Sequence, residues 1–142
     1  MHLGGAAVAI CGFVMLNALA DDQELSQQRA GVEANQAMAR LEQGNRRCIE
    51  GQSLHAHDLA KWRERFLATQ QPFATVLGCS DSREPPELLF DQGFGDLFVI
   101  RVAGNIVDPD VVGSIQYAVE HLDNKLIVLL GHQNCGAVTA AL

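Results

Sequence analysis

The chain has 142 residues and a formal net charge of −7. This length suits one domain that buries its own core without disulfides. Acidic and basic residues are mixed along the polar part of the chain and form no basic stripe, so a nucleic acid is not expected as a partner.

The first 20 residues differ in composition from the rest. Residues 3–19 are almost entirely apolar, Ala18-Leu19-Ala20 fits a small-x-small cleavage site, and a polar stretch begins at Asp21. We interpret residues 1–20 as a secretory signal peptide, with a membrane anchor as the alternative. Residues 21–142 are then one domain, expected in the periplasm or secreted, without stable membrane insertion. A misannotated start would make the protein cytoplasmic instead.

Two amphipathic helices are predicted before the first strand. Val32–Ile49 carries Met38, Leu41 and Ile49 among alanines and charges, and Gly51 beyond it is a suitable glycine cap. The second helix is expected at about residues 56–69. Cys48 lies on the first helix and is expected to be a small core residue.

Short apolar runs after Pro72 predict three buried strands. A short helix opened by Pro85-Pro86 and a longer helix at about residues 110–122 separate them. This alternation predicts an α/β fold with a parallel β-sheet core flanked by helices and an N-terminal helical arm. Near-continuous apolar strands also predict a sheet buried on both faces. The predicted strands are Phe73–Leu77, Asp96–Val102 and Leu126–Leu130.

Two polar motifs follow the first and third predicted strands. They are Cys79-Ser80-Asp81-Ser82-Arg83 and His132-Gln133-Asn134-Cys135-Gly136. Because ligands gather at the carboxyl ends of parallel strands, we expect Cys79, His132 and Cys135 to meet at one edge of the sheet. Two thiolates and one imidazole form a set that catalytic zinc uses. The fourth position is then left to a water whose pKa falls from about 15.7 to near 7.

Asp81 and Arg83 are close enough along the chain to form a bidentate ion pair. Such a pair keeps the carboxylate ionised and oriented toward the open side of the metal. If the pair separated, Asp81 could become the fourth ligand and close the site. A structural zinc site is the main alternative, whereas a thiol redox pair is disfavoured because the chain has no C-x-x-C spacing.

From Gln70 to Leu142 the sequence closely resembles the β-class carbonic anhydrases. The resemblance implies one zinc ion per chain on Cys79, His132 and Cys135, and an Asp81–Arg83 dyad that gates and supports the metal-bound hydroxide. The implied reaction is reversible hydration of carbon dioxide to bicarbonate and a proton. The segments that show the resemblance are Pro72-Phe73, Gly78–Arg83, Pro85-Pro86-Glu87, Phe90–Gly93, Gly95–Asn105 and Gly131–Val138.

The resemblance also implies residues that contact the substrate. They are Gln70, Phe98, Ala103, Tyr117 and the backbone amide of Gly136. Gln70 is expected to donate to a bound oxygen, and the Gly136 amide is a candidate donor to bicarbonate. For Phe98, Ala103 and Tyr117, ordinary core packing is the alternative.

Two departures from the family pattern affect these expectations. Glu84 stands where a small apolar residue is usual, and could compete with Asp81 for Arg83. The sequence ends at Leu142, whereas family members continue with helices and a strand that help to complete the sheet and the dimer. We therefore expect a C-terminally truncated domain that is poorly stable or depends on self-association, as a homodimer or higher oligomer. Two alternatives remain: an inactive relative that binds zinc or bicarbonate or assists assembly, and a hydrolase of an analogue such as carbonyl sulfide.

Overall fold

The computed structural model describes residues 31–54 and 69–142. The predicted signal peptide and nearly all of the second predicted helix lie outside these ranges. Within them, no helix has the length and apolar character needed to cross a membrane. The elements are α2 (Ala34–Ile49), β1 (Ala74–Cys79), α4 (Pro86–Leu89), β2 (Leu97–Val102), the 3-10 helix η1 (Ala103–Asn105), α5 (Pro109–Leu122), β3 (Ile127–Leu130) and α6 (Gly136–Ala141).

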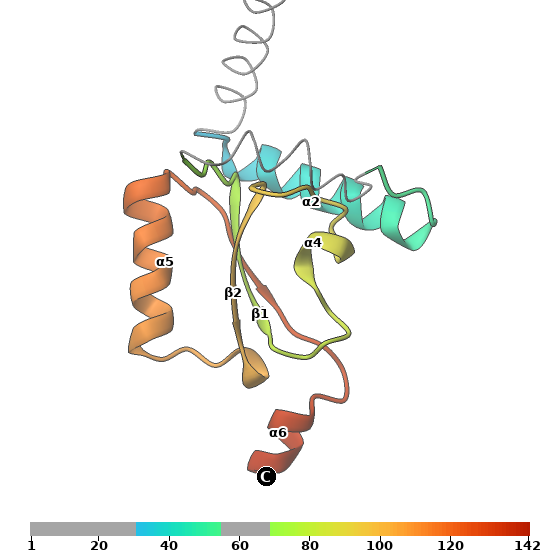
Figure 1. Cartoon of the computed structure of the whole chain (residues 1–142), viewed down its shortest axis with the longest axis vertical. Helices are drawn as coiled ribbons and strands as arrows, with labels where there is room; N and C mark the ends of the chain where they lie inside the picture. Colours follow the sequence, from blue (N-terminus) through green and yellow to red (C-terminus); the bar gives the residue numbers. More distant parts are fainter. Residues whose placement is uncertain (1–30, 55–68) are drawn as a thin grey trace, which may run out of the picture.

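The three described strands form a parallel sheet in the order β2-β1-β3, which confirms the predicted α/β fold. Cys79 pairs with Val102, and Gly78 pairs with Leu130. The carboxyl ends of all three strands therefore lie at the same edge of the sheet. Figure 1 shows α2 across the amino ends of the strands and α6 beyond the carboxyl ends.

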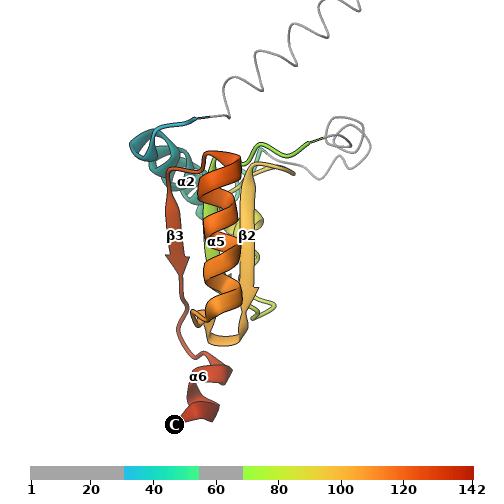
Figure 2. The same ribbon diagram turned by 90° about the vertical axis from the view of Figure 1, so that its left-hand side faces the viewer.

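The strands differ in how well they are covered. All six residues of β1 are buried, as predicted for a central parallel strand. The same prediction is wrong for β3, where Ile127 is 39% exposed and Leu129 is 65% exposed. β3 is an outer strand of the described sheet, and Figure 2 shows α5 covering the middle of the sheet with β3 beside it.

The ends of α5 follow from its sequence. The Asp108 side chain accepts a hydrogen bond from the Val111 backbone N–H at 2.9 Å, and Pro109 occupies the first turn. Asp123 ends the helix in the left-handed conformation. These signals place the helix within one residue of its predicted bounds.

One cluster of the apolar core lies at the amino end of the sheet, under α2. It consists of Val32, Ala37, Leu41, Phe73 and Ala74. The predicted helix is present and ends before Gly51, whose φ of 67° suits glycine.

Two expectations about α2 side chains are wrong. Of the apolar residues predicted on this helix, Leu41 is buried, but Met38 and Ile49 are exposed. Cys48 is only partly buried instead of lying in the core. It belongs to the last turn of α2, which Figure 1 shows extending past the sheet.

The second half of α2 is fixed against the segment that follows α4. A Cβ on Gly44 would collide with the Phe90 carbonyl, so glycine allows this close approach. Arg47 donates through Nε to the buried carboxylate of Asp91, and the Ser53 hydroxyl donates to the same carboxylate at 2.7 Å. The arm therefore has a fixed position relative to the sheet.

Candidate metal centre

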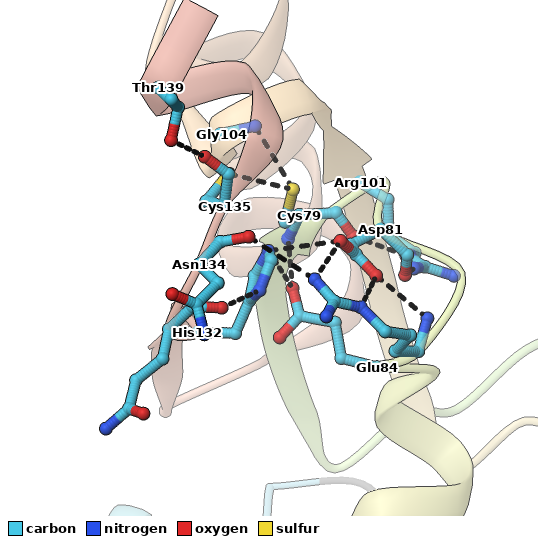
Figure 3. A network of polar contacts seen from close by, with 11 residues as sticks. Cys79, Asp81, Glu84, Arg101, Gly104, His132, Asn134, Cys135 and Thr139 are labelled. Atoms are coloured by element: carbon cyan, nitrogen blue, oxygen red, sulfur yellow. Dashed lines mark hydrogen bonds and ion pairs between the residues drawn. The ribbon is translucent and has the colours of Figure 1, made fainter.

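Cys79, His132 and Cys135 lie together at the carboxyl edge of the sheet. Cys79 is the last residue of β1, while His132 and Cys135 lie in the loop between β3 and α6. One potential ligand atom from each residue lies within 4.8 Å of the other two, and this is the one such group among the described residues. Figure 3 shows the three side chains converging. The predicted convergence of the two motifs is therefore present.

The spacing of these atoms fits a tetrahedral zinc ion. Two Zn–S bonds of about 2.3 Å at a tetrahedral angle would place their sulfurs about 3.8 Å apart. The Sγ atoms of Cys79 and Cys135 are 3.9 Å apart.

The imidazole of His132 is also prepared for a metal. Its Nδ1 lies 2.9 Å from the Gln133 carbonyl, which can only accept, so in the neutral imidazole Nδ1 carries the proton and Nε2 keeps its lone pair. Nε2 is buried and has no hydrogen-bond partner among the described residues. A buried polar atom without a hydrogen-bond partner costs free energy. A metal ion bound at Nε2 would give this nitrogen a partner and remove that cost.

The surroundings of Cys79 favour its thiolate. In the metal-free protein, the protonated His132 imidazole beside the sulfur, and after it the Gly104 backbone N–H, lower the pKa of the Cys79 thiol to about 7. Cys79 in turn raises the pKa of His132. The Gly104 N–H lies 3.2 Å from the sulfur, in a residue with a φ of 69°, where glycine is favoured. A thiolate is the form of cysteine that binds metal.

Asp81 and Arg83 form the bidentate pair that their spacing predicts. Arg83 donates through Nε to Asp81 Oδ1 and through Nη2 to Oδ2, both at 2.8 Å. The guanidinium holds the pKa of the Asp81 carboxyl well below its usual range, and Asp81 raises the pKa of Arg83. Asp81 Oδ2 lies 3.8 Å from His132 Nε2, so this ionised carboxylate borders the ligand cluster.

The expected competition between Glu84 and Asp81 for Arg83 is not observed. Glu84 is buried, and its Oε1 accepts a hydrogen bond from the Cys79 backbone N–H at 3.2 Å. The same oxygen lies 3.7 Å from His132 Nε2. Glu84 therefore faces the ligands, while Arg83 remains paired with Asp81.

Sequence reasoning did not identify Arg101 and Gly104 as site residues. Arg101 donates through Nε to the Cys79 carbonyl at 2.8 Å and through Nη2 to the Asp81 carbonyl at 2.5 Å. It therefore fixes the backbone on both sides of Ser80. The available signal was a single charged side chain within the apolar strand β2.

The residues predicted to contact substrate fall into two places. Ala103 begins η1 directly after Val102, the partner of Cys79, and Gly136 follows Cys135. Both are therefore next to the ligand cluster.

The other three predicted substrate residues lie toward the amino end of the sheet. Phe98 pairs with Thr75, four positions before Cys79, or roughly 13 Å along the strand at about 3.3 Å per residue. The Tyr117 ring lies against Phe98 in a tilted arrangement, with ring centroids 6.0 Å apart, and Gln70 precedes β1. Within one chain, these three side chains are not brought to the ligands.

Comparisons with known proteins agree with this geometry. The carbonic anhydrase family model matches residues 74–142, which contain the three candidate ligands and the Asp81–Arg83 pair. The solved β-carbonic anhydrase of Aspergillus fumigatus superposes with a TM-score of 0.55 and 30% identity, over 74% of this chain and 49% of that chain. The chain belongs to the β-class carbonic anhydrases.

Other carbonic anhydrases share the same segment. Carbonic anhydrase 2 of Mycobacterium tuberculosis is 49% identical over 102 residues, which cover 72% of this chain and 49% of that protein. The carbonic anhydrase of Mycolicibacterium smegmatis is 51% identical over 102 residues, with 72% and 50% coverage. The solved Coccomyxa β-carbonic anhydrase gives a TM-score of 0.53 at 35% identity, over 70% of this chain and 45% of that chain. The chain spans about half the length of the curated relatives that it matches.

Proposed function

We propose that this chain provides the zinc site of an enzyme that interconverts carbon dioxide and water with bicarbonate and a proton. The observation that carries the proposal is the buried Nε2 of His132, which has no hydrogen-bond partner in the described part of the chain and lies beside the thiols of Cys79 and Cys135, whose sulfurs are 3.9 Å apart. Membership in the carbonic anhydrase family supports this reaction over others that use the same ligand set.

A zinc ion at this site would supply a Lewis acid and lower the pKa of a bound water toward 7. The protein contributes charge balance and fixed geometry. Cys79 and Cys135 as thiolates balance the charge of a divalent ion, and His132 adds a neutral donor. The Gly104 N–H stabilises the Cys79 thiolate, while Arg101 holds the Cys79 and Asp81 carbonyls in place.

In this proposal Asp81 orients the reacting water as a hydrogen-bond acceptor. Arg83 keeps the Asp81 carboxylate ionised and holds it in one orientation, with Oδ2 3.8 Å from His132 Nε2. Released from Arg83, the same carboxylate would be close enough to occupy the fourth ligand position and close the site. Asp81 and Arg83 thus form the catalytic pair.

The substrate pocket is completed by a second copy of the chain in a homodimer or higher oligomer. Gln70, Phe98 and Tyr117 lie away from the ligands of their own chain, and Tyr117 is 45% exposed. A neighbouring copy would use them at its own site, beside Ala103 and Gly136. The β-carbonic anhydrases of Sordaria macrospora, whose solved structures are described as tetrameric, are 34% identical to this chain.

The proposed location is the periplasm or the exterior, after removal of residues 1–20. The support is the apolar composition of residues 3–19 and the small residues before Asp21. Mass spectrometry of the N-terminus of the expressed protein, taken from the extracytoplasmic fraction, is expected to begin at Asp21. A mature protein that retains Met1 in the cytoplasm would contradict export.

Metal analysis combined with a stopped-flow pH-indicator assay tests the proposed reaction. We expect one zinc ion per chain and hydration of carbon dioxide above the buffer rate, and Cys79→Ser should lose both. Folded, zinc-loaded protein without hydration would contradict the enzyme and favour a zinc-binding or assembly module. Faster turnover of carbonyl sulfide than of carbon dioxide would reassign the substrate.

A further inference from the structure

We propose that Glu84 is a positioning residue that strengthens the hold of this site on a divalent cation and weakens the binding of anions at the open coordination position. This inference rests on the zinc site proposed above. It assigns a role to a carboxylate that is separate from the ligand set and from the Asp81–Arg83 pair.

The position of Glu84 is the first observation. Its side chain is 7% exposed, and one oxygen, Oε1, accepts from the Cys79 backbone N–H at 3.2 Å and lies 3.7 Å from His132 Nε2. Figure 3 shows the Glu84 carboxylate directed at Cys79 and His132. One carboxylate therefore borders two of the three ligand residues.

The local backbone holds Glu84 in this place. Pro85 restricts the preceding residue to extended conformations, and the Glu84 N–H donates to the Asp81 carbonyl at 3.3 Å. Pro86 is fully buried beneath the turn. The side chain therefore meets the site from a fixed turn.

Glu84 does not belong to the ligand set itself. The atoms of Cys79, His132 and Cys135 lie within 4.8 Å of one another, and neither Glu84 nor Asp81 joins this group. Glu84 thus lies beside the position of the ion. From there it acts through the charge of the site and through the Cys79 backbone.

The two neighbouring carboxylates differ in their partners. Asp81 is neutralised by a bidentate contact with Arg83. Glu84 has His132 within ion-pair distance, and binding a metal requires the neutral imidazole. The two thiolates balance the ion, Arg83 balances Asp81, and the Arg101 guanidinium is held on the Cys79 and Asp81 carbonyls. Glu84 is therefore a second carboxylate beside the ligands that has no bidentate arginine partner like that of Asp81 among the described contacts.

A negative charge in a poorly exposed place, 3.7 Å from His132 Nε2, has two effects. It attracts a dication, and it repels an anion that enters the fourth position. Water and carbon dioxide are neutral and avoid this repulsion, whereas bicarbonate, the anionic product, is repelled like other anions. Glu84 would therefore set which fourth ligands the site accepts.

Two substitutions separate the charge of Glu84 from its hydrogen bond. Glu84→Gln removes the charge but keeps an oxygen for the Cys79 N–H, whereas Glu84→Leu removes both. Glu120→Gln is the matched control, because it makes the same substitution at an exposed residue of α5. Chelator competition measures zinc affinity. Absorption of the cobalt-substituted protein during azide titration measures anion affinity.

We expect Glu84→Gln to lower zinc affinity by about 10- to 100-fold, the usual range for partners of metal ligands. Azide should bind about fivefold more tightly or better, the factor for removing one unit charge about 4 Å away under full water screening. Glu120→Gln should change neither quantity. Unchanged zinc and azide affinities in Glu84→Gln would overturn the inference while leaving the zinc enzyme intact.

Other outcomes are equally decisive. If Glu84→Leu alone loses affinity, the hydrogen bond rather than the charge matters, and the inference is wrong. If the unsubstituted protein binds no zinc or cobalt, the proposed function fails together with it. If Glu84→Gln does not fold, Glu84→Asp is compared with Glu84→Leu, because only Glu84→Asp retains the charge. Glu84→Asp should then bind azide more weakly than Glu84→Leu. Equal azide affinity in those two variants would also overturn the inference.

Discussion

The two ends of the sheet are stabilised by different means. At the amino end, apolar side chains such as Leu41 and Phe73 pack beneath α2, where burial provides the stabilisation. At the carboxyl end, hydrogen bonds join Cys79 to Glu84, Arg101 and Gly104. β1 connects these regions, because Ala74 belongs to the core and Cys79 to the candidate metal centre.

The carboxyl end also contains an unfavourable feature. His132 Nε2 is buried there and has no hydrogen-bond partner among the described residues. The loops there depend on β1, which is buried along its whole length. The comparison indicates that burial at the amino end stabilises the fold. This stability offsets the cost of holding the ligands together at the carboxyl end.

The largest expected effect at the carboxyl end is on turnover. Asp81→Asn removes the charge that Arg83 holds beside the ligands, so carbon dioxide hydration should fall by about 10²- to 10⁴-fold, the usual contribution of an acid–base group. Zinc content and the unfolding midpoint should stay close to those of the parent, because Asp81 lies outside the three-ligand set. Stopped-flow hydration measures turnover, metal analysis measures zinc content, and urea denaturation gives the unfolding midpoint.

Asp110→Asn is the control for this change. Asp110 lies exposed in the first turn of α5, so the same substitution there should leave turnover unaltered. Loss of zinc in Asp81→Asn would show that the dyad holds the metal, and the separation of roles within the carboxyl end would be wrong.

A substitution at the amino end should lower stability and leave metal binding unchanged. Leu41 is 1% exposed, and Leu41→Ala should lower the free energy of unfolding by about 2–5 kcal/mol through lost burial and a cavity. The folded fraction should still bind one zinc ion per chain. Urea denaturation followed by circular dichroism measures the change. Met38→Ala on the exposed side of the same helix should cost less than half as much; equal losses would argue against a core under α2.

The sequence predicted what depends on neighbours along the chain. Apolar runs identified the strands, and Cys79 and His132 could be placed together because each comes at or just after a strand end. The Asp81–Arg83 pair followed from a spacing of two residues. In each case a local pattern or a general rule of parallel sheets was sufficient.

Features that depend on the three-dimensional turn were beyond this reasoning. Glu84 was expected to face Arg83, but the turn between β1 and α4 directs it toward the ligands. Arg101 and Gly104 reach Cys79 from more than 20 positions away, and no pattern in the sequence pairs them with it. The resemblance predicted Phe98 and Tyr117 as pocket residues. It did not indicate whether they belong to the site of their own chain or to that of a neighbouring copy.

A polar substitution inside the amino end should have an intermediate effect. The buried Asn124 donates through Nδ2 to the Pro72 carbonyl at 3.0 Å, and its Oδ1 accepts from the Thr75 hydroxyl at 3.2 Å. Asn124→Leu leaves both partners buried and unpaired, so stability should fall by about 1–3 kcal/mol. Urea denaturation measures the loss. Adding Thr75→Val should recover part of it, because one unpaired group is then removed; a strictly additive double variant would contradict the coupling.

The smallest expected effect is a shift in the reactivity of one thiol at the carboxyl end. In metal-free protein, alkylation of Cys79 should rise with pH and reach half its maximum near pH 7, because His132 and the Gly104 N–H lower the thiol pKa to about 7. In urea the same thiol should titrate near its ordinary value of about 8.5, so the native protein reacts at lower pH than the unfolded chain. Iodoacetamide labelling, followed by mass spectrometry of the Cys79 peptide, gives both curves. Equal alkylation midpoints in native protein and in urea would mean that the metal-free site does not lower the pKa of Cys79. The ligands would then be organised by the ion itself.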